Sequence, residues 1–153
     1  LAHEARETGR VFAFDVQASA IVRAEARIDK AGLSERVAFI HAGHETAANV
    51  LSGEADGQLW AATFNLGYLP GSDKAVVTDG STTITALSTL TRMAAQGCVI
   101  SVHTYRGHDG GETEFQQVGT WLRELPWEEW RVAEYSFINK IKNKETLFLL
   151  EKV

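Results

Sequence analysis

Cysteine, proline and long apolar runs are all scarce in this chain of 153 residues. With a single cysteine, Cys98, the chain cannot form an internal disulfide framework. Because Val99 and Ile100 follow it, we expect Cys98 to lie in a strand and to pack there as a small buried apolar side chain. We therefore expect a reducing, cytoplasmic setting. Apolar runs such as residues 147–150 are far too short to cross a bilayer, so we expect no membrane association.

Several well-known site patterns are also missing. The sequence has no phosphate loop ending in Gly-Lys-Ser/Thr and no Gly-x-Ser-x-Gly turn, and its five histidines lack metal-binding spacing, so no metal is expected. The net charge of −5 argues against a broad basic surface for nucleic acid. A local cluster at Lys140, Lys142 and Lys144 is compatible with a solvated loop or with a nucleic-acid contact.

Strand and helix patterns alternate along a length that fits one domain, residues 1–153. Apolar strands are predicted at 11–14, 37–40, 59–64 and 98–102, and helices at 18–30, 45–51, 81–95 and 112–125. Ser81 or Thr82 is expected to cap the third helix. Two last strands, 130–138 and 146–151, have too short a link for a helical crossover, so they should pair antiparallel. This order predicts an α/β fold with a doubly wound sheet and a terminal antiparallel hairpin.

The most informative segment is 64–74, Phe-Asn-Leu-Gly-Tyr-Leu-Pro-Gly-Ser-Asp-Lys, at the end of a predicted buried strand. In open α/β sheets, ligands bind at the carboxyl ends of the strands. There the amide of Asn65 could accept from a substrate amine, and Tyr68 could stack on a flat ring. Both residues could instead only shape the turn. Asp73 and Lys74 either pair with each other or reach the substrate.

Polar residues also follow other predicted strands. Asp15 follows the first strand, where a carboxylate can accept from ribose hydroxyls; capping the next helix is an equally good interpretation. Gly43 and His44 follow the second strand and could pack an adenine, although a loop histidine is more often only solvated. His108, in the polar loop 105–112, could accept a proton or contact the substrate, or simply stabilise the loop.

Five motifs taken together resemble one family of class I S-adenosylmethionine-dependent methyltransferases, first labelled "putative rRNA methylases". The matching parts are Phe-Ala-Phe-Asp-Val-Gln at 12–17, the segment 64–74, Thr-Asp-Gly-Ser-Thr-Thr at 78–83, Tyr-x-Gly-His-x-Gly-Gly-x-x-Glu at 105–114, and Phe-Ile-Asn at 137–139. The resemblance covers nearly the whole chain. It implies a Rossmann-like sheet and transfer of a methyl group to the aminomethyl group of the tRNA wobble uridine (5-aminomethyl-2-thiouridine), with the tRNA anticodon region as partner.

The resemblance also implies roles for particular residues. Asn65, with the backbone carbonyl of Leu66, would accept from the amine beside the cofactor, and Tyr68 would pack the uracil. Asp15 and Gln17 would hold the ribose of S-adenosylmethionine, with Gly43 and His44 near its adenine. The residues that would position the substrate are Asp73, Lys74 and His108.

One part of the family pattern is missing. The family begins with a strand and a Gly-rich turn that cradles the methionine part of the cofactor, whereas residues 1–7 of this chain resemble only the tail of the following helix. We therefore expect an N-terminally truncated domain that lacks the first strand and the Gly-rich loop. A gap should interrupt the sheet between the strands at 11–14 and 59–64, and cofactor binding should be weak or absent.

Other functions stay open at this point. The acidic net charge favours methyl transfer to rRNA or to a small-molecule amine over transfer to tRNA, and a non-catalytic nucleotide-binding module is a third possibility. A homodimer is compatible with the apolar residues Trp121, Trp127 and Trp130, although core packing explains at least some of them.

Overall fold

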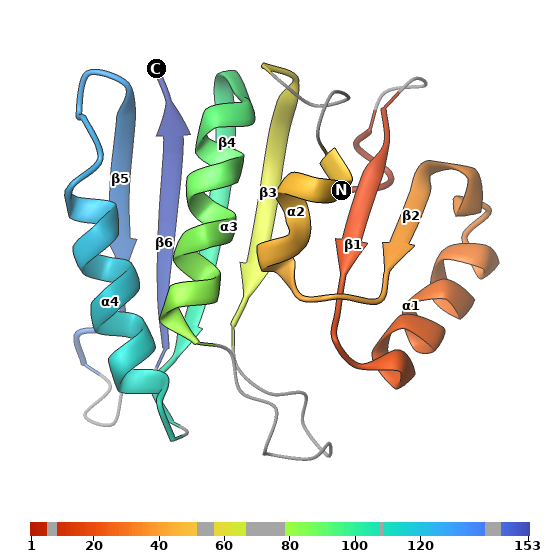
Figure 1. Cartoon of the computed structure of the whole chain (residues 1–153), viewed down its shortest axis with the longest axis horizontal. Coiled ribbons are helices and arrows are strands. Elements are labelled where there is room, and N and C mark those ends of the chain that lie inside the picture. Colours follow the sequence, from red (N-terminus) through yellow and green to blue (C-terminus); the bar gives the residue numbers. More distant parts are fainter. Residues whose placement is uncertain (6–8, 52–56, 67–78, 108, 140–144) are drawn as a thin grey trace. The chain divides into compact units, whose positions relative to one another are not determined.

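The computed structural model describes the chain except for residues 6–8, 52–56, 67–78, 108 and 140–144 (Figure 1). The described residues form two compact units, Leu1–Thr46 and Ala47–Val153. Each unit has its own sheet, and each is described by itself below.

The first unit is a strand–helix–strand arrangement. It contains β1 (Val11–Phe14), α1 (Ala18–Lys30) and β2 (Val37–Ile40), and the two strands pair in parallel with Val11 opposite Val37. Short 3-10 turns lie at η1 (Ser34–Arg36) and η2 (His44–Thr46). Gly32 has a φ of +69°, a left-handed conformation that favours glycine just after a helix. All three predicted elements before residue 41 are confirmed with the predicted bounds.

The second unit holds a four-stranded mixed sheet with the order β3-β4-β6-β5. Its elements are α2 (Ala47–Leu51), β3 (Leu59–Asn65), α3 (Gly80–Met93), β4 (Ala94–Tyr105), α4 (Gly111–Arg123), β5 (Trp130–Tyr135) and β6 (Glu145–Lys152). β3 and β4 are parallel, whereas β6 runs antiparallel to both of its neighbours. The predicted terminal antiparallel hairpin is therefore confirmed.

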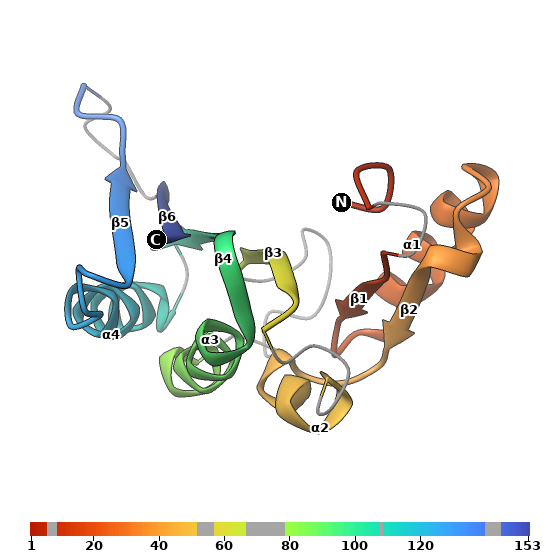
Figure 2. The same ribbon diagram turned by 90° about the horizontal axis from the view of Figure 1, so that it is seen from above.

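The core of this unit lies between the sheet and two helices. Figure 2 shows α3 and α4 side by side on one face of the sheet. Side chains alternate along β4, so that Cys98, Ile100 and Val102 are fully buried on the helix side, whereas Val99 on the opposite face is exposed. The prediction that Cys98 is a small buried hydrophobe is confirmed.

Several predicted boundaries differ from the structure. α3 is capped by Asp79, not by Ser81 or Thr82, because the Asp79 carboxylate accepts from the backbone N–H of Ser81 (3.2 Å) and from its hydroxyl (2.8 Å). These two bonds also hold the pKa of Asp79 below its usual value. α3 ends at Met93, and β4 begins at the next residue, well before the predicted start at residue 98.

Among the described residues, β1 pairs only with β2, and β3 pairs only with β4, so each unit has its own sheet. No helix in the described part of the chain combines the length and apolar character that a membrane span requires.

Trp130 belongs to the core, at 4% exposure, whereas Trp127 is 74% exposed.

Candidate functional site

The carboxyl end of β3 places an exposed amide next to a buried leucine. Asn65 is the last residue of the strand and is exposed, whereas Leu66 is only 2% exposed. The backbone N–H of Leu66 donates to the carbonyl of His103 at 2.9 Å. This bond extends the pairing of β3 and β4 by one residue and anchors the backbone at Leu66. Asn65 is thus presented at the edge of the sheet on a fixed backbone.

Two aromatic side chains of β4 share a sheet face with Asn65. Asn65 pairs in register with His103, and neighbouring residues in register point to the same face. The ring of His103 lies 4.3 Å from that of Tyr105, centroid to centroid, and its Nδ1 lies 3.0 Å from the Tyr105 hydroxyl oxygen. This contact orients the imidazole beside the amide.

The sequence did not single out His103. Its place beside Asn65 depends on the parallel register of two strands that are far apart in the chain, and no local motif encodes that register. The sequence offers one local signal for this pair. Side chains alternate between the two faces of a strand, so His103 and Tyr105, two residues apart, lie on the same face.

Four predicted site residues lie outside the described residues: Tyr68, Asp73, Lys74 and His108. The lysine cluster at 140, 142 and 144 lies outside them as well. Their roles stay predictions.

The predicted ribose-binding residues lie at the carboxyl end of β1. One carboxylate oxygen of Asp15 accepts from the backbone N–H of Gln17 at 2.8 Å, and the Asp15 N–H donates to the carbonyl of Ile40 at 3.2 Å. Gln17, not Asp15, is the residue that caps α1, and its side chain makes no capping bond. Asp15 therefore shapes the turn before the helix with one oxygen. Its second oxygen makes no hydrogen bond to any described residue.

The predicted adenine-contacting residues follow β2 in the turn η2. The carbonyl of Gly43 accepts from both the backbone N–H (3.1 Å) and the hydroxyl (2.7 Å) of Thr46. A side chain at Gly43 would collide with the carboxylate of Glu45. Burial lowers the pKa of His44, and the negative charge of Glu45 opposes part of this effect. His44 is therefore favoured in its neutral form.

The ends of β1 and β2 are tied together by a histidine. Nε2 of His41 lies 3.0 Å from the carbonyl oxygen of Val16. Because the two strands are parallel, the residues that follow them lie at one edge of the sheet. The structure thus brings Asp15, Gln17, Gly43 and His44 to one edge of the first unit, and Asn65 and Leu66 to the carboxyl edge of the second.

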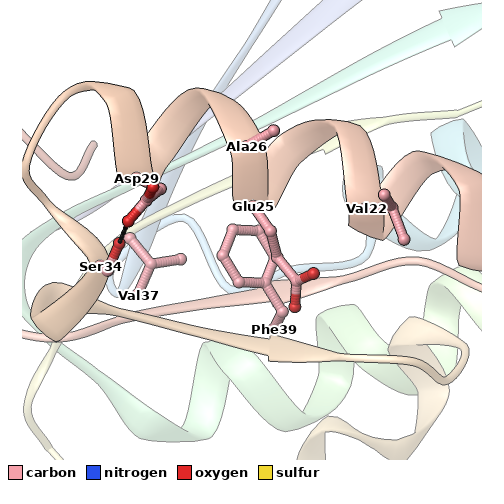
Figure 3. A pocket seen from close by; sticks show the side chains of 7 residues that line it. All are labelled: Val22, Glu25, Ala26, Asp29, Ser34, Val37 and Phe39. Atoms are coloured by element: carbon pink, nitrogen blue, oxygen red, sulfur yellow. Dashed lines mark hydrogen bonds between the residues drawn. The ribbon is translucent and has the colours of Figure 1, made fainter.

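A groove of about 450 Å³ lies elsewhere in the first unit (Figure 3). It is lined by α1, the turn after it and β2, through Val22, Glu25, Ala26, Asp29, Ser34, Val37 and Phe39. Across it, the hydroxyl of Ser34 donates to a carboxylate oxygen of Asp29 at 3.3 Å. None of the predicted cofactor-binding residues, all of which the structure describes, lines this groove, so it is not the predicted cofactor site. In the described part of the chain, no three His, Cys, Asp or Glu residues are grouped to hold a metal ion.

Solved structures with the same fold are methyltransferases. A crystal structure of a "putative rRNA-methylase" from Clostridium thermocellum is 33% identical, with a TM-score of 0.92, and the match covers 100% of this chain and 80% of that one. A "putative methyltransferase" from Streptococcus mutans in complex with SAH is 29% identical, with a TM-score of 0.82, over 94% of this chain and 76% of that one. The fold is therefore that of the Rossmann-like methyltransferases.

The family model described as "Putative rRNA methylase" matches residues 11–151, and the chain belongs to this family. A curated relative is the chloroplastic tRNA (mnm(5)s(2)U34)-methyltransferase of Arabidopsis thaliana, 31% identical over 147 residues. The match covers 94% of this chain and 53% of the relative, so the chain spans about half the length of that protein.

Proposed function

We propose that the protein is an S-adenosylmethionine-dependent methyltransferase that methylates the aminomethyl group of the tRNA wobble uridine. The observation that carries the proposal is the 31% identity to the Arabidopsis thaliana enzyme over 94% of this chain, because that relative's name states the nucleoside. The family match over residues 11–151 and the SAH-bound structure from Streptococcus mutans support the choice of methyl donor.

The residues at the edge of the first unit fit the nucleoside part of the donor. Asp15 has a carboxylate oxygen that meets no described hydrogen-bond donor, and a carboxylate can accept from both hydroxyls of a ribose. The neutral form of His44, which burial favours, suits packing against an uncharged adenine ring. Gln17, Gly43 and His44 complete this proposed nucleoside-binding edge.

The residues at the end of β3 fit the acceptor amine. In this proposal the side-chain carbonyl of Asn65 and the backbone carbonyl of Leu66 accept hydrogen bonds from the neutral amine and direct its lone pair. When bound, S-adenosylmethionine supplies a methyl group on a positively charged sulfur. The nucleophile is the substrate amine itself. The protein therefore needs to align this amine with the methyl group and to keep it in its neutral form. The proton that the amine loses goes to solvent.

Nucleoside analysis of a deletion strain tests the substrate. Mass spectrometry of total tRNA should show accumulation of the unmethylated aminomethyl uridine, and a plasmid copy of the gene should reverse it. rRNA from the same strain serves as the comparison. If a methyl group disappears from rRNA while the tRNA nucleosides are unchanged, the tRNA assignment is wrong.

An amide-to-alanine change tests the role of Asn65. We expect Asn65→Ala to abolish turnover while the affinity for S-adenosylmethionine, measured by calorimetry, changes little. The reason is that the amide contacts the acceptor and not the ribose. Wild-type turnover in this variant would exclude the proposed contact with the amine.

A further inference from the structure

One row of side chains crosses the whole sheet of the second unit. Asn65 of β3 pairs in register with His103 of β4, and His103 pairs with Leu147 of β6. Leu147 pairs in turn with Tyr135 of β5. Neighbouring residues in register point to the same face, so the row lies on one face of the sheet. Because neighbouring strands are about 4.8 Å apart, the row places Tyr135 about 14 Å from Asn65.

The helices of the second unit leave this face open. They pack on the opposite face, where Ile100 and Val102 of β4 are fully buried (Figure 2). On the face that carries the row, Leu149 of β6 is 40% exposed and Tyr135 is 58% exposed. Among the described residues of this unit, no helix covers these side chains.

Aromatic rings lie at both ends of the row. Tyr135 meets Phe137 edge to face, with ring centroids 5.5 Å apart and ring planes at 76°. Phe137 is itself 47% exposed, and the next residue, Ile138, is fully exposed. Toward the other end, His103 forms the ring contact with Tyr105 described above. Exposed apolar side chains are normally scattered singly, so this group at the end of β5 indicates a surface that binds something.

The exposed rings lie at the same edge of the sheet as Asn65. β6 is antiparallel to both β4 and β5, so β5 runs parallel to β4 and β3 (Figure 1). Tyr135 is the last residue of β5, as Asn65 is the last residue of β3. The Phe-Ile-Asn motif at 137–139 follows Tyr135 after one residue and has no role in the proposed site so far. Its phenylalanine completes the exposed ring pair.

Flat rings on an open sheet face suit unpaired nucleobases. Single-stranded RNA is commonly bound by stacking its bases on aromatic side chains, including those on the face of a sheet. Tyr135 is too far from Asn65 to touch the base whose amine Asn65 would hold, so it would meet another base of the same loop. Among the described residues, the row contains no lysine or arginine, and Arg106 stacks on Phe115 of α4, 4.5 Å from its ring centroid. The surface therefore fits bases better than phosphates.

We propose that Tyr135 and Phe137 stack on a base near the wobble uridine in the anticodon loop while Asn65 holds the aminomethyl group. This inference rests on the proposed function and adds a second contact with the same RNA. It gives the ring pair no contact with the methyl donor or with the reacting amine. The pair should therefore affect the reaction with RNA and leave donor binding unchanged.

Removal and restoration of one ring test the proposal. The substrate is an anticodon stem-loop with 5-aminomethyl-2-thiouridine at the wobble position. We expect Tyr135→Ala to lower kcat/KM for this RNA by about 10- to 100-fold, the effect of losing one stacked base. Tyr135→Phe keeps the ring and should keep most of the activity. The calorimetric Kd for S-adenosylmethionine should stay within about twofold in both variants.

Removal of the partner base identifies what the ring contacts. A set of stem-loops is made, each lacking one base of the loop other than the wobble base. One of them should react with the wild-type protein as slowly as the complete stem-loop reacts with Tyr135→Ala. On that RNA, Tyr135→Ala should cause little further loss, because the contact is already absent. A ring that only supports the fold would slow the reaction with every RNA by the same factor.

Two controls separate stacking from other effects. Trp127→Ala removes a ring that is 74% exposed but precedes β5, at the opposite end of this strand, and it should keep wild-type kcat/KM. The loss in Tyr135→Ala should be about the same at low and high salt, because a lost ring contact releases no counterions. Phe137→Ala is the second variant of the pair, and both residues are exposed, so Tm should change little in either.

The outcomes distinguish the two proposals. Wild-type kcat/KM for the complete stem-loop in both Tyr135→Ala and Phe137→Ala overturns the stacking surface and leaves the proposed function standing. An equal loss on every stem-loop also overturns it. So does a change from dimer to monomer in sedimentation with unchanged kcat/KM, which would assign the surface to a second copy of the chain. If the wild-type protein binds S-adenosylmethionine but does not methylate the complete stem-loop, the proposed function fails, and the stacking surface fails with it.

Discussion

Removing both partners of the Thr83–Glu114 hydrogen bond should cost less stability than the two single changes together. Thr83→Val leaves a buried carboxyl oxygen without its 3.0 Å donor, which we expect to lower the free energy of unfolding by about 1–3 kcal/mol. Glu114→Leu leaves the buried Thr83 hydroxyl without this acceptor and should also destabilise the protein. In the double variant two apolar side chains of similar size face each other.

The expected size of the effect follows from the burial of the pair. Neither residue is more than 2% exposed, so solvent cannot replace the lost partner. We expect a coupling energy of about 1–2 kcal/mol in the double-mutant cycle. For a chain of this length each kcal/mol corresponds to about 2–4 °C in Tm.

Urea unfolding followed by circular dichroism measures the four free energies of the cycle. The double variant should recover stability relative to the sum of the single variants. Strict additivity would show that the bond contributes nothing specific.

Three further predictions concern other residues. Burial raises the pKa of the Cys98 thiol from 9.0 to about 11, so about 100-fold less thiolate is present near neutral pH. We therefore expect this thiol to react with Ellman's reagent only when the protein is unfolded in urea. Rapid labelling of the native protein would contradict this expectation. The lowered pKa of His44 means that the folded state binds fewer protons than the unfolded state. The stability it contributes is therefore complete above the unfolded pKa of 6.5 and is lost as pH falls through the lower, folded value. His44→Gln should flatten the urea-midpoint profile in that acid range, and an unchanged profile would rule out this linkage. Asp15→Asn keeps an oxygen that accepts from the Gln17 N–H but removes the negative charge. The Kd for S-adenosylmethionine should therefore rise about tenfold, with little change in Tm. An unchanged Kd would mean that Asp15 only shapes its turn.

Local patterns were sufficient to predict the elements themselves. α1 begins and ends at the residues that its helical spacing and Gly32 predict, and the short link between β5 and β6 correctly predicts their antiparallel pairing. β4 was predicted too short because its first residues follow α3 without a break, and propensity alone does not mark the change. The cap of α3 was assigned to Ser81 or Thr82, although Asp79 provides a carboxylate two residues before Ser81.

The candidate site was predictable only where it follows a strand end. Asn65 and Asp15 were found because each closes an apolar run, which is a local signal. His103 and the Thr83–Glu114 pair were missed as partners because both depend on contacts between distant segments. The motif at residues 105–114 includes Glu114, but it does not indicate which residue Glu114 contacts. That contact, with Thr83, is known only from the packing of α3 against α4.

The position of β6 has a consequence for how the protein is made. This strand follows both β4 and β5 in the sequence, yet it lies inside the sheet between them and pairs with both. During synthesis, β4 and β5 leave the ribosome first and cannot reach their final pairing until β6 follows. Until then, each of them exposes an edge that can pair with another chain. The second unit therefore completes its sheet only once β6 has been synthesised, and the interval before that is when a chaperone that shields strand edges would matter most.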